Sequence, residues 1–590
     1  MPMHPRQPIT LVLVAASVAL ALGFSRTPLW DEDEPRFAAI ARTMVESGDW
    51  IVPTYNDTLA VDKPVLMHWC MAAAMALLGP NEFAARLPSA LATLLIALAL
   101  LRAGSRWFDT ETGVVAALAY VGCLLAAIEA HAATPDAILV ALTTWATILA
   151  AEPFVPHDRA PAGGPFPRLS FARAAAVGGL AGLAVVCKGP IGFVGPAAVI
   201  ILWLACLAVG RRWSDGKPRL PLLAAAAGDV IRAVRPVTVL AAMLAVAAPW
   251  YVAVALRTDG AWTAGFFLVH NVGRFLAPME KHGGGPLFHT FALLVGFYPW
   301  SCLLPLAAAL AGWRLWRRAV PAPASAALAL ALIWLAVWLG GFSAAATKLP
   351  NYVLPAYPAA ALLVAVLLVG SARAAAAAAG RWPHGRWMAT GLACLVFGGI
   401  ATAVAVLVAA RHGASGAEPA ALVGIVPIGG AIACGWLAGR RPQGAVAAAV
   451  LTGLIYTALA VGAAGGRLAG ANAVPALARA MQARHGGAAR LGTYLMASPN
   501  VVFYSNGHVR QFVMEHDADA ARFLHGDRDA ILLVPEDRFA DIAAALPEGV
   551  GEVARARPIF RRHDVLAIGW TAAEPPAAPP RAAANPEVRR

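Results

Sequence analysis

The sequence predicts a polytopic α-helical membrane protein with about thirteen transmembrane helices and a small C-terminal α/β domain. Of its 590 residues, 59% are hydrophobic and only 13% are charged, whereas a soluble protein carries about 25% charged residues. A membrane-spanning helix needs roughly 20 mostly apolar residues, and such runs recur along most of the chain. This composition does not fit a soluble enzyme, a disordered chain or a nucleic-acid-binding protein, so we expect membrane lipids and no nucleic acid as partners.

Thirteen apolar runs are long enough to be candidate spans. They cover residues 9–24, 87–104, 113–130, 136–152, 173–187, 190–210, 236–256, 288–312, 322–344, 351–370, 388–410, 421–438 and 443–464. The run 65–79 is shorter and carries His68, so we interpret it as a helix lying at the membrane interface. We interpret the first run as an uncleaved helix, because no A-x-A site precedes the acidic residues that follow it.

The distribution of arginine predicts the topology. With the N-terminus in the cytoplasm, the loops on the cytoplasmic side are rich in arginine, as the positive-inside rule requires. On the opposite side, the short loop 131–135 has no Lys or Arg and the loop 411–420 has only Arg411. Thirteen spans from an inside N-terminus place residues 465–590 outside the cytoplasm.

The chain therefore divides into three parts. Residues 1–464 form the membrane domain, and its first external loop, 25–86, holds nine of the twenty acidic residues found before position 470. Residues 465–570 form the α/β domain, with strand-like runs at 501–504, 530–534 and 565–568 and a helical pattern at 536–546. The Ala/Pro-rich tail 571–590 is typical of disorder. The seven Cys fit no disulfide scaffold and have no metal-ligand spacing.

The first external loop opens with L-W-D-E-D-E-P-R-F at 29–37. Ionisable groups close to the membrane are functional candidates by default, which singles out Asp33 and Glu34. The alternative is a solvated acidic turn with Arg36 and Arg42 as helical partners.

Two charged residues mark the ends of later spans. Asp136 follows Pro135 at the external start of the fourth span, near the positive end of the helix dipole. Lys188 follows seven apolar residues in V-V-C-K-G-P, where a lysine either snorkels to the interface or binds an anion. For Asp136 the alternative is an ordinary acidic residue at a helix start.

Further cations lie in external segments. Arg274 follows His270 in H-N-V-G-R-F-L, and its planar fork could pair with a phosphate. Lys348 and Tyr352 lie in T-K-L-P-N-Y-V-L-P at 347–355. The alternatives are a surface cation for Arg274 and interfacial anchors for the other two.

Together these residues put carboxylates and cations on one membrane face. That layout suits a reaction in which an anionic group leaves while an acidic group orients or deprotonates a nucleophile. A leaving phosphate would use Lys63 and Arg274, with Lys348 as a further candidate. No Walker A loop and no G-x-G-x-x-G after a strand is present, so a soluble nucleotide-sugar donor is not predicted.

The blocks W-D-E-D-E-P-R-F, D-K-P-V-L-M-H-W and F-A-A-R-L-P-S-A resemble the lipid A aminoarabinose transferases. That group belongs to the dolichyl-phosphate-mannose-protein mannosyltransferase-like glycosyltransferases of the GT-C fold. The later blocks T-P-D-A, C-K-G-P, A-P-W-Y, G-R-F, Y-P-W-S and T-K-L-P-N-Y-V-L-P agree in order. The resemblance covers about residues 9–370 and implies a bacterial inner-membrane enzyme with its active site on the periplasmic face.

The resemblance also implies a substrate class and roles for single residues. The donor would be a polyprenyl-phosphate sugar, typically undecaprenyl phosphate, and the acceptor lipid A, another lipid or glycan, or a protein. Alignment on Trp30 and Arg36 matches Asp33, rather than Asp31, to the catalytic aspartate. The other matched residues are Glu34 and Asp136 as further acids, Lys63 for the donor phosphate, Arg274 of the R-F block, and Lys348 and Tyr352 of the late block.

Four positions depart from the lipid A enzymes. Phe37 replaces a usual Tyr, Ala60 a usual aromatic residue, Asp62 a usual Glu, and His270-Asn271 a usual Glu-His. These departures leave glycosyl transfer as the expected activity and leave the sugar and the acceptor open.

We therefore interpret the chain as a polyprenyl-phosphate-dependent glycosyltransferase that inverts the anomeric carbon by single displacement. Three alternatives stay open: a protein O-glycosyltransferase, a polyprenyl-lipid transporter without chemistry, and a membrane scaffold. No cofactor is certain from the sequence, and a divalent metal stays an open requirement.

Overall fold

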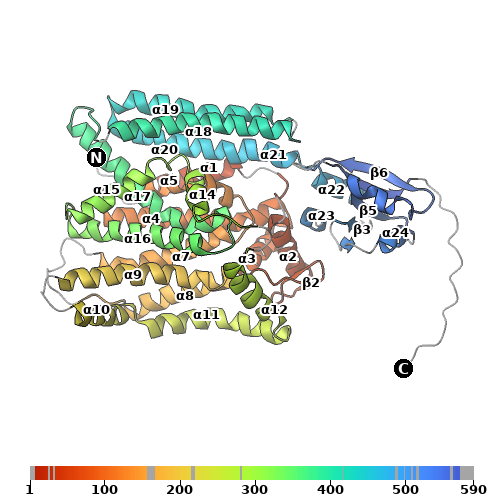
Figure 1. Cartoon of the computed structure of the whole chain (residues 1–590), viewed down its shortest axis with the longest axis horizontal. Coiled ribbons are helices and arrows are strands. Elements are labelled where there is room, and N and C mark those ends of the chain that lie inside the picture. Colours follow the sequence, from red (N-terminus) through yellow and green to blue (C-terminus); the bar gives the residue numbers. More distant parts are fainter. Residues whose placement is uncertain are drawn as a thin grey trace. The chain divides into compact units, whose positions relative to one another are not determined.

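The computed structural model places most of the chain (Figure 1). It describes residues 7–23, 27–30, 33–155, 166–213, 219–278, 282–383, 385–414, 416–484, 490–496, 498–505, 509–512, 517–525, 527–558 and 563–571. The chain divides into two compact units, residues 1–471 and 472–590, and each is described by itself.

Ten helical segments of the described residues are long and apolar enough to cross a membrane. They are α4 (Glu82–Trp107), α7 (Asp136–Ala151) with η1 (Glu152–Phe154), α8 (Phe171–Lys188), α9 (Ile191–Trp213), α11 (Pro236–Arg257), α16 (Ala322–Ala344), η3 (Pro350–Ala356) with α17 (Tyr357–Ala377), α18 (Gly385–Arg411), η4 (Glu418–Gly424) with α19 (Ile425–Ala438), and α20 (Pro442–Leu459) with η5 (Ala460–Gly465) and α21 (Gly466–Gly470). Each coincides with a predicted span, and the multi-pass helical fold is confirmed.

The other three predicted spans are not long continuous helices. The run 113–130 forms α5 (Thr110–Val121) and α6 (Leu124–Ala130), bent by 67°. The run 288–312 forms α14 (Phe288–Gly296) and α15 (Leu304–Trp316), and the amide of Leu124 donates to the carbonyl of Tyr298 between them at 2.9 Å. The first run forms the 17-residue helix α1 (Gln7–Gly23). This one hydrogen bond connects the two breaks, and hydropathy alone does not reveal it.

The segment predicted as the first external loop forms helices and a hairpin over its described residues 33–86. It contains α2 (Asp33–Ser47), a two-stranded hairpin of β1 (Thr54–Tyr55) and β2 (Thr58–Leu59), and α3 (Leu66–Leu78). The hairpin turns at Asn56-Asp57, both with positive φ, as a two-residue hairpin turn requires. The run predicted to lie at the interface is α3, and its 13 residues are shorter than a span.

Short helices complete the membrane unit. The amphipathic α10 (Arg219–Val234) occupies a segment predicted as a loop. Beyond α11, the chain forms α12 (Ala261–Ala264), the π-helix η2 (Gly265–Gly273) and α13 (Arg274–Leu276). These last elements are the ones that carry the H-N-V-G-R-F-L block.

The structure also pairs two cysteines that the sequence left unpaired. Cys302, between α14 and α15, forms a disulfide with Cys394 of α18 across 92 residues of sequence. The sequence offered no signal for this pair, because cysteine pairing depends on tertiary proximity and not on spacing alone.

The C-terminal unit is built on a five-stranded mixed sheet. The strand order is β4 (Val509–Phe512), β3 (Arg490–Tyr494), β5 (Ala530–Pro535), β7 (Val565–Trp570) and β6 (Val550–Ala556). Parallel pairing joins β3 to β4 and β5, and antiparallel pairing joins β7 to β5 and β6. The helices are α22 (Val474–Arg484), α23 (Pro499–Tyr504), α24 (Asp517–His525), η6 (Glu536–Arg538) and α25 (Phe539–Ala543).

Two of the three predicted strands, 530–534 and 565–568, are present as β5 and β7. The prediction of a strand at 501–504 is wrong, because these residues belong to helix α23. Pro499 sits in the first turn of that helix, where its missing N–H costs nothing. Short buried apolar runs do not distinguish a strand from a helix. Of the helical pattern at 536–546, η6 and α25 cover 536–543. In the Ala/Pro-rich tail, residues 572–590 lie outside the described residues.

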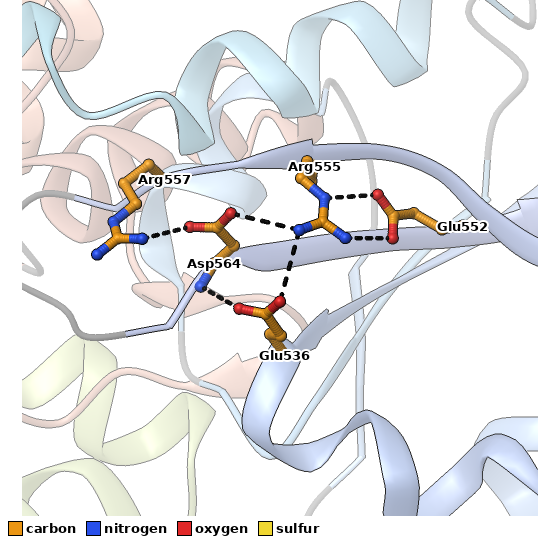
Figure 2. A network of polar contacts seen from close by, with 5 residues as sticks. All are labelled: Glu536, Glu552, Arg555, Arg557 and Asp564. Atoms are coloured by element: carbon orange, nitrogen blue, oxygen red, sulfur yellow. Dashed lines mark hydrogen bonds and ion pairs between the residues drawn. The ribbon is translucent and has the colours of Figure 1, made fainter.

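Figure 2 shows a network of ion pairs that joins β6 to the start of β7 and the end of β5. Arg555 holds Glu552 through two 2.7 Å hydrogen bonds and approaches Glu536 at 3.5 Å and Asp564 at 3.7 Å. Arg557 binds Asp564 at 3.2 Å. Because the arginines are about half exposed, each pair contributes little by itself, and the network serves to align the strands.

Candidate functional site

A cavity of about 310 Å³ lies among the first external loop, the start of α7, the junction of α8 and α9, and the segment η2–α13. The predicted site residues that line it are Lys63, Asp136, Lys188, His270, Arg274 and Tyr352. Residues far apart in the sequence thus line one cavity. The order of the motif blocks along the chain does not reveal this convergence.

The chain turn after α8 shapes one wall. Gly189 has a φ of +80°, and a Cβ there would lie 2.6 Å from the Phe266 ring. Only glycine combines this conformation with the close approach. The G of C-K-G-P is therefore what lets α8 end against η2 with Lys188 at the cavity.

Asp136 and Lys188 form a buried ion pair. The Lys188 Nζ lies 2.5 Å from the Asp136 Oδ1, and Asp136 is only 4% exposed. Asp136 is the first residue of α7 and Lys188 the last of α8, so each charge opposes the partial charge of its own helix end. Lys188 therefore does not snorkel, and its ammonium also lies 5.2 Å from the centre of the Tyr352 ring.

Tyr352 connects this pair to Arg274. The Arg274 Nη1 donates to the Tyr352 hydroxyl at 3.2 Å, so one aromatic ring touches two cations. Arg274 begins α13 directly after the π-helix η2, which also carries His270 to the cavity wall.

Lys63 and Asp62 come from the first loop. The Lys63 Nζ donates to the Asp62 carbonyl at 3.2 Å, and the Asp62 carboxylate lies 3.6 Å from Arg36. Burial acts to raise the pKa of Asp62, but Lys63 and Arg36 outweigh it and lower that pKa. The buried Trp262 donates its Nε1–H to the Ala60 carbonyl at 2.7 Å and so anchors this stretch.

Asp62 was not among the predicted site residues. The sequence marked Asp62 only as a departure from the lipid A enzymes, at a position where they usually have Glu. Asn271 and Thr347 also line the cavity and were not predicted.

Glu34 lies in a buried network of hydrogen bonds, and its predicted catalytic role stays a prediction. Its carboxylate is 4% exposed and accepts four hydrogen bonds: from Arg86 Nε at 3.0 Å and Nη2 at 2.8 Å, and from the backbone amides of Trp30 at 2.6 Å and Ala133 at 2.7 Å. Both carboxylate oxygens are thereby held, and Glu34 links the start of α2 to α4 and to the segment just before α7. The Arg86 partnership, 52 residues away, has no signal in the local sequence.

Asp33, the neighbouring acid, is exposed at the first residue of α2. It is not among the residues that line the cavity. Arg36, one turn later, reaches Asp62 and so links α2 to the cavity wall. Asp31 and Glu32 lie outside the described residues.

Lys348 is not brought to the cavity either. Its Nζ donates to the carbonyls of Ser343 at 2.6 Å and Phe342 at 3.4 Å, at the C-terminal end of α16. A cation there satisfies carbonyls that the helix end leaves open. Lys348 thus caps the end of α16, and its predicted contact with the donor phosphate stays a prediction.

The cavity lining carries three cations, Lys63, Lys188 and Arg274, against two carboxylates, Asp62 and Asp136. Such a lining can hold a phosphate group and keep acids beside it. Within the described residues, no three His, Cys, Asp or Glu side chains group in a way that could hold a metal ion.

Comparison with known proteins identifies relatives. Residues 62–228 match the family described as dolichyl-phosphate-mannose-protein mannosyltransferase. The chain is 30% identical over 359 residues to an undecaprenyl phosphate-α-4-amino-4-deoxy-L-arabinose arabinosyl transferase of Pseudomonas aeruginosa. A transferase of the same name from Shewanella sediminis is 30% identical over 336 residues. The matched regions cover 60% and 55% of this chain, and 58% and 53% of the relatives' length.

Solved structures show the same architecture. ArnT of Cupriavidus metallidurans bound to undecaprenyl phosphate superposes with a TM-score of 0.75, at 22% identity, over 96% of this chain and 98% of that one. Its apo form gives a TM-score of 0.73 over 95% and 97%. The predicted fold class and the resemblance drawn from the motif blocks are confirmed.

Proposed function

Because this chain is a multi-pass membrane protein of the GT-C fold, related to the undecaprenyl phosphate aminoarabinose transferases, we propose that it is a glycosyltransferase. It transfers a sugar from a polyprenyl-phosphate donor to lipid A, lipopolysaccharide or another periplasmic acceptor. The observation that carries this proposal is the convergence of Lys63, Lys188 and Arg274 on one cavity beside Asp62 and Asp136.

In the proposed reaction the bond between the anomeric carbon and the donor phosphate oxygen breaks. The phosphate keeps the electron pair, and the cations stabilise the charge that develops on it. An acceptor oxygen attacks the opposite face of the anomeric carbon, which inverts its configuration. Asp136 keeps Lys188 aimed and charged, and Tyr352 places Arg274.

Asp33 is the proposed group for the acceptor. A hydroxyl acceptor would give its proton to Asp33, whereas a phosphate acceptor needs only orientation. The fixed position of Glu34 supports this role, because it immobilises the start of α2 where Asp33 is exposed.

The transfer itself can be tested with purified full-length protein, a synthetic undecaprenyl-phosphate sugar and lipid A. We expect release of undecaprenyl phosphate and a matching mass increase of the acceptor. Donor that stays intact with every lipid, glycan and protein acceptor would contradict the proposal. The matched family's description names a protein acceptor, so mass shifts of secreted proteins and of lipid A in a deletion strain should be compared.

Removing cations from the cavity should weaken donor use. Lys63→Ala and Arg274→Ala should each lower transfer by about 10²-fold, since each removes a charge-assisted contact to the phosphate. Arg274→Lys should restore activity only in part, because lysine lacks the planar fork. The measurement is the rate of transfer at varied donor concentration. The control is Arg257→Ala, which removes an exposed cation paired with Asp49. If this control lowered transfer as much as Lys63→Ala and Arg274→Ala do, the phosphate would bind elsewhere.

We propose the bacterial inner membrane as the location and the periplasmic face as the side of the cavity. The arginine-rich loops support this orientation. The odd parity of the predicted count holds if α1, the α5–α6 pair and the α14–α15 pair each cross once.

A reporter fusion tests this orientation. Alkaline phosphatase fused after Ala471 should be active, because the enzyme matures only in the periplasm. Green fluorescent protein fused at the same residue should stay dark. The reverse pattern would overturn both the parity and the periplasmic site.

A further inference from the structure

Three arginines surround one carboxylate at the end of α7 and α8 that lies away from the cavity. Glu152 binds Arg102 at 2.5 and 3.0 Å, Arg173 at 2.9 Å and Arg106 at 3.8 Å. The Glu152 side chain is 3% exposed, whereas the three guanidinium groups are 30–42% exposed. The cluster therefore presents net positive charge outward, roughly 24 Å from the cavity along the 16 residues of α7.

An apolar groove of about 130 Å³ begins beside this cluster. It lies among α7, α8, α9 and the corner between α10 and α11, which lie together in Figure 1. Its lining is apolar throughout: Ala146, Ala150, Leu169, Val177, Ala181, Phe193, Pro196, Ala197, Ile200, Ile201, Val234, Pro236, Val239 and Leu240. Ile201 and Leu240 are 49% and 40% exposed, so the groove opens toward the surroundings of the helices.

Two arginines flank one end of the groove. Arg235 lies between the lining residues Val234 and Pro236, and its Nε donates to the carbonyl of Leu169 at 2.6 Å. Its guanidinium stacks on the Phe171 ring at 3.9 Å. Arg173 lies one helical turn before the lining residue Val177.

Each arginine donates to a backbone carbonyl, and Arg173 also donates to Glu152 from the same Nη1 at 2.9 Å. Arg173 donates from Nη1 to the carbonyl of Leu149 at 3.0 Å, next to the lining residue Ala150. Arg235 uses only Nε in the hydrogen bonds of the described residues. A guanidinium has five N–H donors, so each retains the capacity to bind a further anion.

We propose that this groove binds an anionic phospholipid, with an acyl chain in the groove and the phosphate on Arg173 and Arg235. Apolar grooves with basic residues at the membrane surface suit anionic head groups. The charge argues against the polyprenyl tail of the donor, which is uncharged and would gain nothing from arginines. The site lies at the opposite helix ends from the candidate active site, and the proposal does not depend on sugar transfer.

Native mass spectrometry of the full chain in detergent can test this with phosphatidylglycerol and phosphatidylcholine of identical acyl chains. We expect phosphatidylglycerol to bind at least about tenfold more tightly, and Arg173→Gln/Arg235→Gln to lower its affinity about tenfold or more. Arg317→Gln/Arg440→Gln is the matched control, because it removes two cations that stack on tryptophans elsewhere.

A second variant tests the groove without changing charge. Ala197→Phe should fill it and weaken binding of both phospholipids. Equal binding of the two head groups by the wild type, or an equal loss in the control variant, would overturn the proposal. Ala197→Phe displacing undecaprenyl phosphate but not phosphatidylglycerol would show instead that the groove holds the donor tail. Thermal melting of each variant checks that it is folded.

Discussion

Glu34→Gln should destabilise the membrane unit by about 3–5 kcal/mol, the usual cost of breaking a buried ion pair. The carboxylate of Glu34 meets only donors: two nitrogens of Arg86 and the amides of Trp30 and Ala133. A glutamine amide would turn its NH₂ group toward two of these donors and deprive the Arg86 charge, itself 6% exposed, of its carboxylate partner. Unfolding of the full chain in mixed micelles measures the effect.

Glu46→Gln is the matched control on the same helix. Glu46 pairs with Arg42 at 2.6 Å, but its side chain is 57% exposed, so the cost should stay below about 0.5 kcal/mol. The double variant Glu34→Gln/Arg86→Gln should lose less stability than the sum of the losses in the two single variants, because it removes both charges and leaves no lone buried charge. Equal, small effects for Glu34→Gln and Glu46→Gln would show that the buried pair does not hold the fold.

Asp33→Asn should lower sugar transfer by roughly two to four orders of magnitude, the usual scale for a general acid or base. The change keeps the size of the side chain and removes its charge. Because Asp33 is exposed, melting temperature should stay near that of the wild type. Asp33→Asn should thus lose transfer and keep its stability, whereas Glu34→Gln should lose stability. This difference distinguishes the roles of the two neighbouring acids.

Asp31→Asn is the control, because it removes one charge from the same acidic run. Its transfer rate should fall far less than that of Asp33→Asn. Equal losses would mean that the run acts as a diffuse negative field, and a larger loss for Asp31→Asn would mean that the acceptor group was assigned to the wrong acid. Each rate is measured with purified donor at matched expression level.

Much of the fold was predictable, because hydrophobicity over about 20 residues is a strong and local signal. The ten long spans follow from it, whereas strands β5 and β7 follow from short runs of apolar residues. The bent α5–α6 pair and the interrupted α14–α15 pair do not, since their breaks depend on a hydrogen bond between Leu124 and Tyr298, 174 positions apart in the chain. The strand prediction at 501–504 was wrong for a different reason: four apolar residues are too few for their periodicity to distinguish a strand from a helical turn.

The candidate site likewise has features that are predictable from the sequence and features that are not. The amino-acid sequence alone identifies the charged candidates, because charges near membrane spans are costly and therefore few. Four of them, Lys63, Asp136, Lys188 and Arg274, line one cavity. The partners of these residues become visible in the three-dimensional fold: Glu34 is held by Arg86, Lys348 caps α16, Lys188 pairs with Asp136, and Asp62 joins the site. The physical reason is that a charge acts through neighbours within a few ångströms, and in a bundle of antiparallel helices those neighbours come from the ends of different helices.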